Sequence, residues 1–168
     1  MMRITFEDRA EAGAFLATKL THYGQRDDVM VLGLPRGGIP VAYPIAQALG
    51  APLDVFVVRK LGAPGQKELA LGAIAMGGVI ILNHDLIEAM HIPQAEVDAI
   101  VRQEKLELMR REHLYRGNRP PPIIQDRTVI LVDDGLATGA TMCCWRRRSS
   151  STRRTKTSLM SSNALRPT

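Results

Sequence analysis

Cysteine is scarce in this chain, and its placement excludes two kinds of site. The 168 residues include two cysteines, Cys143 and Cys144, which are adjacent. Adjacent cysteines match neither the Cys-x-x-Cys redox motif nor the ligand spacing of a zinc site. In a cytoplasmic protein thiols stay reduced, so we also expect no structural disulfide.

Long apolar runs are missing as well. No run approaches the roughly 20 residues that a helix needs to span a bilayer. The opening segment, Met1–Asp8, lacks the apolar core of a signal peptide and already carries two acidic residues. These absences predict a cytoplasmic protein with no membrane partner.

The formal net charge of +5 comes from one end of the chain. Residues 142–168 carry seven basic residues and no acidic one. Of the 22 basic and 17 acidic residues in the whole chain, 15 basic and all 17 acidic ones therefore lie in residues 1–141. A basic surface favours nucleic acid, but here it would have to rest on the tail alone, so nucleic-acid binding by the tail is only a weak alternative.

The tail, residues 142–168, is rich in arginine, serine and threonine, and only eight of its 27 residues are apolar. Such a segment buries too little surface to offset the entropy lost on ordering. We therefore expect one folded domain over 1–141. We expect the tail to be disordered, or out of frame relative to a complete domain. Either case would leave one sheet edge uncovered and could leave the chain inactive.

Apolar periodicity predicts alternating strands and helices. The expected helices cover 6–22 with Thr5 as N-cap, 39–49 and 93–115, and the expected strands cover 29–34, 53–58 and 129–132. Strand, helix and strand in succession favour parallel pairing in an α/β sheet. Residues 71–75 and 79–83 predict a hairpin, and the Gly/Pro-rich segment 61–70 predicts a mobile lid.

The run Val129–Thr141 carries the most information about function. Four apolar residues predict a buried strand, because parallel strands covered on both faces are continuously apolar. Asp133 and Asp134 follow at its carboxyl end, where ligands bind in open α/β sheets. The loop after them offers backbone N–H groups and two hydroxyls to an anion. This order suits a sugar phosphate; the plainer alternative is a strand followed by an Asp-Gly turn.

Two further loops are candidates for the same site. Arg36, Gly37 and Gly38 follow the strand at 29–34; glycines allow close backbone approach and an arginine can bind phosphate. Arg59 and Lys60 end the strand expected at 53–58. Because the carboxyl ends of parallel strands share one sheet edge, we expect all three loops to meet there. A plain tight turn and an exposed strand end are the respective alternatives.

The acid pair and the Thr-Gly-x-Thr loop after it resemble the signature of the type I phosphoribosyltransferases. The resemblance implies a Rossmann-like central parallel sheet with flanking helices and a small hairpin or hood, here incomplete at the C-terminus. It also implies binding of phosphoribosyl pyrophosphate with Mg²⁺, and transfer of the phosphoribosyl group to a nitrogenous base or amine with release of pyrophosphate. A homodimer is compatible with it.

The resemblance assigns roles to individual residues. Asp133 and Asp134 would hold the ribose hydroxyls directly or through Mg²⁺, and Arg59 and Lys60 would stabilise the leaving pyrophosphate. The pyrophosphate loop would be Arg36, Gly37 and Gly38. The remaining substrate-binding positions, which would cradle the 5′-phosphate, are Gly135, Leu136, Ala137, Thr138, Gly139, Ala140 and Thr141.

Ala137 departs from one branch of the family. Enzymes for 6-oxopurines use an aspartate at this place, and alanine cannot handle a ring proton. The acceptor is therefore left open. Two alternatives to an active enzyme also stay open: a non-catalytic regulatory protein that binds the same ligand, and an inactive truncated homologue.

Overall fold

The computed structural model describes residues 6–135 and 156–161, which form two compact units. The parallel-sheet unit consists of residues 6–56, 122–135 and 156–161, and the antiparallel-sheet unit consists of residues 57–121. Each unit has its own sheet. No helix within the described ranges is long and apolar enough to cross a membrane.

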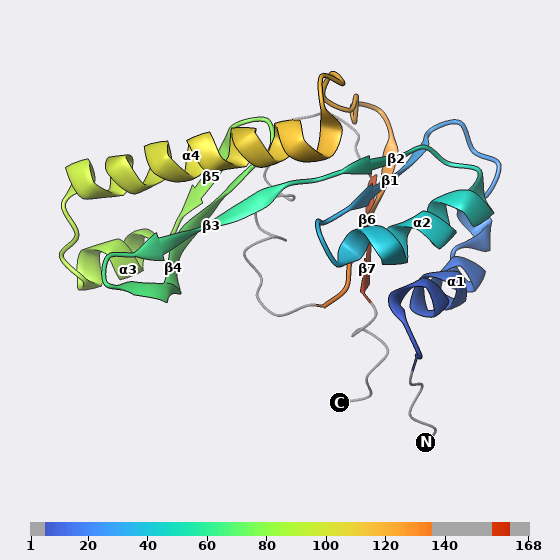
Figure 1. The fold of residues 1–168 in the computed structure, drawn as a ribbon, viewed down its shortest axis with the longest axis horizontal. Coiled ribbons are helices and arrows are strands. Elements are labelled where there is room, and N and C mark those ends of the chain that lie inside the picture. Colours follow the sequence, from blue (N-terminus) through green and yellow to red (C-terminus); the bar gives the residue numbers. More distant parts are fainter. Residues whose placement is uncertain (1–5, 136–155, 162–168) are drawn as a thin grey trace. The chain divides into compact units, whose positions relative to one another are not determined.

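The parallel-sheet unit contains four strands in the order β2, β1, β6, β7 (Figure 1). Their bounds are Leu53–Val55 for β2, Val29–Gly33 for β1, Thr128–Asp133 for β6 and Lys156–Ser161 for β7. Every neighbouring pair is parallel. The expected α/β class with a central parallel sheet is confirmed.

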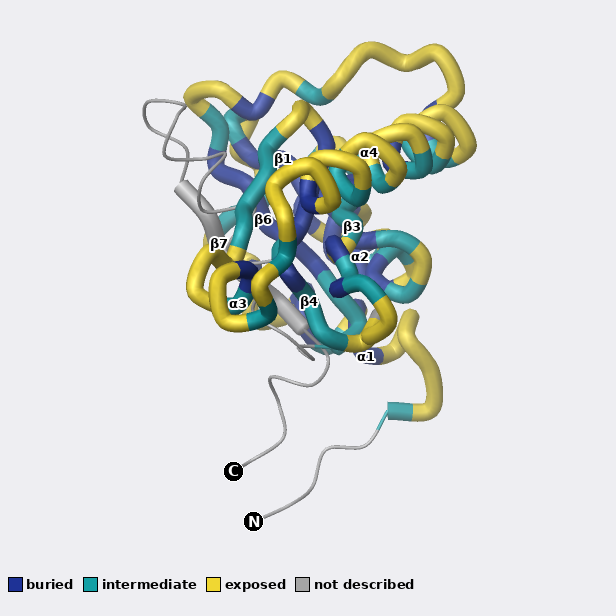
Figure 2. The backbone as a smooth tube through the Cα atoms, turned by 90° about the vertical axis from the view of Figure 1, so that its left-hand side faces the viewer, coloured by how far each residue is buried: buried dark blue, intermediate teal, exposed yellow. Residues whose placement is uncertain are grey.

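The two central strands are buried on both faces. All five residues of β1 are buried, and in β6 only Asp133 is partly exposed. Figure 2 shows these strands in dark blue beneath more exposed segments. Side chains on one face of the two strands join the core formed with α1 and α2, which contains Leu16, Ala17, Leu20, Val29, Val31, Val41, Ala42, Ile45, Ala46, Leu49, Ile130 and Val132.

Helix α2, Gly38–Leu49, packs on this sheet, and helix α1, Arg9–Lys19, packs on α2. The predicted end of α2 is confirmed, because Gly50 adopts a left-handed conformation with φ 64°. A Cβ at Gly13 would overlap the Val41 carbonyl oxygen, so this glycine allows the two helices to approach closely.

The start of the first helix differs from our expectation. Asp8, not Thr5, is the N-cap of α1, and its side chain accepts a hydrogen bond from the Glu11 N–H at 2.8 Å. An aspartate accepts from the free N–H groups of a first helical turn. The helix ends at Lys19, and a separate 3₁₀ turn, η1, covers Thr21–Tyr23.

The antiparallel-sheet unit consists of β3 Val58–Ala63, β4 Gln66–Ala75, β5 Val79–Leu82, α3 His84–Ala89 and α4 Gln94–Arg116. The hairpin predicted across 76–78 is confirmed, with Ala75 paired to Val79. The segment 61–70, which was expected to be a mobile lid, forms the end of β3 and the start of β4; its role as a lid stays a prediction. Pro64 and Gly65 make the turn between the two strands. Helix α3 was not expected.

The edge of the parallel sheet beside β6 also differs from expectation. Composition indicated no regular element in the tail, yet residues 156–161 form β7 and pair with β6 along its whole length. Parallel pairing uses backbone groups, which side-chain composition does not report. The expected uncovered edge is therefore covered, while the expectation of disorder or a shifted frame stays a prediction for the rest of the tail.

A polar cluster joins the starts of β1 and β6. The Arg26 guanidinium donates to both Asp28 carboxylate oxygens, at 3.0 and 2.7 Å. The Thr128 hydroxyl donates to the same carboxylate at 2.8 Å. Hydrogen bonds from Arg26 and then from Thr128 lower the pKa of Asp28 to about 2.

We expect Asp28 to stabilise the fold in a pH-dependent way. Its folded pKa of about 2 lies below the ordinary value of 3.8, so its contribution is complete above that value. The contribution is lost as pH falls toward the folded pKa. Thermal unfolding of the wild type and of Asp28→Asn at pH 7 and near pH 2.5 measures it. The variant should melt at a lower temperature than the wild type at pH 7, and the difference in melting temperature should be smaller near pH 2.5. An equal difference at both pH values would contradict a stabilising role for the Asp28 carboxylate.

Candidate active site at the end of the parallel sheet

The acidic pair stands where β6 ends. Asp133 is the last residue of the strand and half-buried, and its Oδ1 accepts a hydrogen bond from the Asp134 N–H at 2.9 Å. Burial raises the pKa of the Asp133 carboxyl, and the neighbouring Asp134 charge adds to this, against the lowering effect of backbone hydrogen bonds. A carboxylate held at a strand end with a raised pKa is typical of a functional site.

The loop after β1 lies directly against the acidic pair. Leu34 N–H donates to the Val132 carbonyl at 2.9 Å, which fixes this loop beside the end of β6. A Cβ at Gly37 would overlap the Asp134 carboxylate, and a Cβ at Gly38 would lie 2.6 Å from the Val132 carbonyl oxygen. Both glycines therefore allow a contact that a side chain would prevent. The peptide bond between Pro35 and Arg36 is cis.

Helix α2 begins at this same edge. Gly37 is its N-cap, and Gly38 is its first residue. The Gly38 and Ile39 N–H groups donate to the Leu34 and Arg36 carbonyls, so it is the helix dipole that favours negative charge at this end. The strand end at Asp133 and the start of α2 thus place carboxylates beside the positive end of a helix dipole, which suits a ligand that carries both hydroxyl and phosphate groups.

A third element reaches the acidic pair from far away in the sequence. Arg9, the first residue of α1, donates from Nε and Nη2 to Asp134 Oδ2 at 3.0 and 2.8 Å. Arg9 is not among the site residues predicted from the sequence. The position of Arg9 was one signal in the sequence. A cation in the first turn of a helix opposes the helix dipole, so an arginine there indicates a role other than stabilising the helix.

The predicted site residues divide into three groups. The structure brings Arg36, Gly37 and Gly38 together with Asp133, Asp134 and Gly135 at one edge of the parallel sheet. Leu136, Ala137, Thr138, Gly139, Ala140 and Thr141 lie outside the described residues. Arg59 and Lys60 are not at the end of the second strand as expected, because β2 ends at Val55 and both residues lie within β3 of the other unit.

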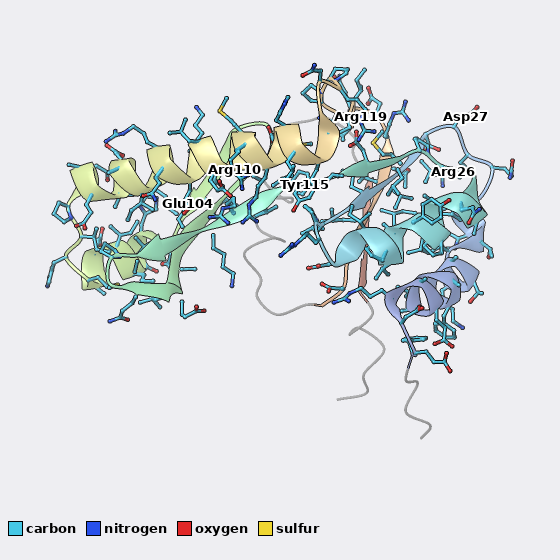
Figure 3. The ribbon with its side chains drawn as sticks, viewed as in Figure 1. Arg26, Asp27, Glu104, Arg110, Tyr115 and Arg119 are labelled. Atoms are coloured by element: carbon cyan, nitrogen blue, oxygen red, sulfur yellow. The ribbon has the colours of Figure 1, made fainter. Side chains whose placement is uncertain are left out.

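Arg59 already has an acidic partner in its own unit. Its guanidinium pairs with the Glu104 carboxylate of α4, with Nη2 to Oε2 at 2.6 Å and Nε to Oε2 at 2.8 Å. Figure 3 labels Glu104. Both side chains are about four-fifths buried, with exposed fractions of 24% and 21%. Lys60, the next residue along the strand, is exposed. The role of both cations toward pyrophosphate stays a prediction.

The donor set at the end of β6 fits a magnesium ion that is shared with a phosphorylated ligand. Among the residues that the structure describes, no group of three or more His, Cys, Asp or Glu could hold a metal by itself. Magnesium is commonly bound by one or two carboxylates together with water and substrate phosphates. Asp133 and Asp134 supply that number of carboxylates.

Comparison with known proteins agrees with this geometry. The sequence matches the family model described as the phosphoribosyl transferase domain over residues 6–147. The chain belongs to this family. The match extends a few residues beyond position 141, the end of the folded domain that the sequence predicts.

Two relatives of this phosphoribosyl transferase domain are informative. A Mycobacterium tuberculosis protein named a phosphoribosyl transferase is 49% identical over 136 residues, which are 81% of this chain and 30% of that protein. The chain thus spans less than a third of that relative's length. The crystal structure of TT1426 from Thermus thermophilus is 35% identical, with a TM-score of 0.69 over 94% of this chain and 85% of the other.

A more distant neighbour supports the fold alone. The crystal structure of a hypoxanthine phosphoribosyltransferase from Staphylococcus aureus aligns with a TM-score of 0.54 at 13% identity. The alignment covers 92% of this chain and 62% of that one. The expected phosphoribosyltransferase fold is therefore confirmed for this phosphoribosyl transferase domain.

Proposed function

We propose that this chain binds phosphoribosyl pyrophosphate with Mg²⁺ and transfers the phosphoribosyl group to a nitrogenous base or an amine, releasing pyrophosphate. One observation carries the proposal. The Asp133–Asp134 pair and the Arg36–Gly38 loop lie in contact at the carboxyl edge of one parallel sheet. In open α/β sheets this edge is where ligands bind, and membership of the family supports the same ligand class.

The acidic pair would bind the ribose. Carboxylate oxygens accept hydrogen bonds from hydroxyl groups, and those bonds are stronger than bonds between neutral groups. Asp133 and Asp134 would accept from the 2′- and 3′-hydroxyls or share Mg²⁺ with the ligand. The loop from Gly135 to Thr141 would hold the 5′-phosphate, as the sequence predicts.

The Arg36–Gly38 loop would bind pyrophosphate. Its glycines allow the backbone to approach the ligand, and the start of α2 favours an anion. When bound, Mg²⁺ would offset the negative charge of the pyrophosphate group. Arg36 would add a permanent cation, since a guanidinium stays protonated at any physiological pH.

Transfer would break the bond between ribose C1 and a pyrophosphate oxygen and form a bond from C1 to a nitrogen of the acceptor. The nitrogen supplies its lone pair for the new bond and gives up a proton to water. The electron pair of the broken bond leaves with pyrophosphate, and the ribose passes through an oxocarbenium-like state. Preorganised donors and cations stabilise charge that develops on the leaving group. Holding both reactants in line supplies the remaining rate enhancement.

One observation favours a second candidate, a non-catalytic protein that binds the same ligand. Arg59, one of the two cations predicted for the leaving pyrophosphate, is paired with Glu104. A cation held by a carboxylate stabilises a leaving group less than an uncompensated one does. The two candidates share a ligand and differ in turnover.

Two measurements test these candidates. We expect titration calorimetry of the full chain with phosphoribosyl pyrophosphate in Mg²⁺ buffer to show saturable binding. We then expect pyrophosphate release with at least one member of a panel of purines, pyrimidines and simple amines. Binding without release favours the regulatory protein, and no binding by the folded chain contradicts both candidates.

A further inference from the structure

We propose that Arg9 is a positioning residue of this site, which orients the Asp134 carboxylate to accept the ribose hydroxyls of the ligand. The inference rests on the proposed function and adds a residue from the N-terminal helix to it. Arg9 lies 125 positions before Asp134 in the sequence, so the contact depends entirely on the fold.

The geometry of the contact restricts the carboxylate. Arg9 Nε and Nη2 both donate to the same oxygen, Asp134 Oδ2, at 3.0 and 2.8 Å. A planar guanidinium presents donors at fixed angles, so two bonds from it restrict rotation of the group that accepts them. A Cβ at Gly37 would overlap this same oxygen. Asp134 Oδ2 is therefore held by two hydrogen bonds from Arg9 and lies against the backbone of Gly37.

Packing of helix α1 against the core fixes the position of Arg9. Leu16 and Leu20, on the helix and at its end, are buried in the core beneath α2. Gly13 is in close contact with the Val41 carbonyl, which fixes the separation of the two helices. The first turn, which carries Arg9, is therefore placed by packing further along the same helix.

The ion pair is poorly explained as a stabilising contact. The side chains of Arg9 and Asp134 are 58% and 33% exposed, and exposed ion pairs contribute little to stability. A cation at the start of a helix also opposes the helix dipole. Arg9 therefore adds little to the stability of α1 or lowers it. We infer that its two hydrogen bonds serve to orient Asp134.

The charge of Arg9 also matters for an anionic ligand. Asp133 and Asp134 are adjacent carboxylates, and a ligand with several phosphates would be repelled by two uncompensated negative charges. The guanidinium offsets one of these charges. Arg9 would thus improve ribose binding through Asp134 and need not touch the ligand.

The test is a double-mutant cycle on the full chain. Binding of phosphoribosyl pyrophosphate in Mg²⁺ buffer is measured by calorimetry for the wild type, Arg9→Ala, Asp134→Ala and the double variant. We expect Arg9→Ala to weaken binding about 10- to 100-fold, as loss of groups that orient a ligand-binding residue does. In the Asp134→Ala background the same change should have no further effect, because Arg9 acts through Asp134.

Binding of a second ligand tests whether Arg9 orients Asp134 or only supports the structure of the site in general. Inorganic pyrophosphate has no ribose hydroxyls, so Arg9→Ala should weaken its binding less than that of phosphoribosyl pyrophosphate, through the lost positive charge alone. Arg9→Lys keeps the charge without the planar group, and it should recover part of the lost affinity for phosphoribosyl pyrophosphate. Lys19→Ala removes an exposed cation from the other end of α1 and should leave binding unchanged.

The outcomes are distinct. Unchanged or tighter binding by Arg9→Ala would overturn the proposal, since a contact that only blocks Asp134 predicts tighter binding. An equal loss in the Asp134→Ala background, or an equal loss for pyrophosphate, would show a different role for Arg9. If Arg9→Ala does not fold, Arg9→Lys and Arg9→Gln complete the comparison. Absence of binding by the folded wild type would contradict the proposed function itself.

Discussion

Replacing Asp133 and Asp134 together by asparagine is expected to remove most binding of phosphoribosyl pyrophosphate while the chain stays folded. Hydrogen bonds to charged groups contribute about 1.5–3 kcal/mol each. Two such bonds therefore correspond to about a 100-fold to 10,000-fold loss of affinity. Titration calorimetry in Mg²⁺ buffer measures the loss directly.

The fold should tolerate this double change. Burial raises the pKa of Asp133, which means that the folded chain holds this negative charge at a cost. Asparagine has nearly the same shape and keeps an oxygen that accepts the Asp134 N–H. The lost ion pair to Arg9 is largely exposed and contributes little. The melting temperature should therefore change by only a few degrees.

A matched acidic pair provides the control. Asp27 and Asp28 are also adjacent, and they precede β1 at the other end of the strands (Figure 3). Asp27→Asn/Asp28→Asn makes the same change in net charge and should lower stability through the lost contacts of Asp28. Its affinity for phosphoribosyl pyrophosphate should equal that of the wild type. Similar affinity losses in both double variants would mean that net charge, and not the site, controls binding.

The sequence predicted the residues at the carboxyl ends of β1 and β6 well, because the signals there are local. Four apolar residues, two acids and a glycine follow one another in β6 and its loop, and β1 shows the same order of apolar run and glycine loop. Both patterns follow from burial of a central parallel strand. Their meeting at one edge then follows from parallel pairing, with Gly33 opposite Val132.

The errors arose where the deciding interaction is not local. The segment around Pro64 and Gly65 has the composition of a loop, but the β3–β4 ladder on both sides makes it a hairpin turn. The strand expected to reach Val58 ends at Val55, and the chain then enters the other sheet. As a result, Arg59 faces Glu104 of α4, a partner 45 positions away that no local pattern indicates.

The contact between Arg9 and Asp134 shows the same limit. The sequence placed Arg9 in an expected helix and Asp134 in the acidic pair, but their pairing depends on how α1 packs against α2. Gly13 enables that packing, and a lone glycine within a helix predicts only a weaker helix. The sequence thus predicted the acidic pair and the glycine loop that meet at the carboxyl end of the sheet and missed Arg9, which contacts one of the acids.

Gly37→Ala is expected to weaken binding of phosphoribosyl pyrophosphate about 10- to 100-fold, the cost of displacing a group that orients a bound ligand. The backbone at Gly37 has φ −69° and ψ −29°, which alanine adopts without strain. The three atoms nearest to the new methyl group all belong to the Asp134 carboxylate, which is the end of a side chain and can rotate away. The fold should therefore keep its melting temperature while the carboxylate moves out of its present position.

Gly38→Ala, one residue further on, separates this effect from a general disturbance of the loop. Its Cβ would lie 2.6 Å from the Val132 carbonyl oxygen, which belongs to the backbone of β6 and cannot move alone. Overpacking of this kind costs about 1–3 kcal/mol of stability, so Gly38→Ala should lower the melting temperature and Gly37→Ala should not. If both variants lose stability equally, or if Gly37→Ala binds like the wild type, the orientation of Asp134 does not determine ligand binding.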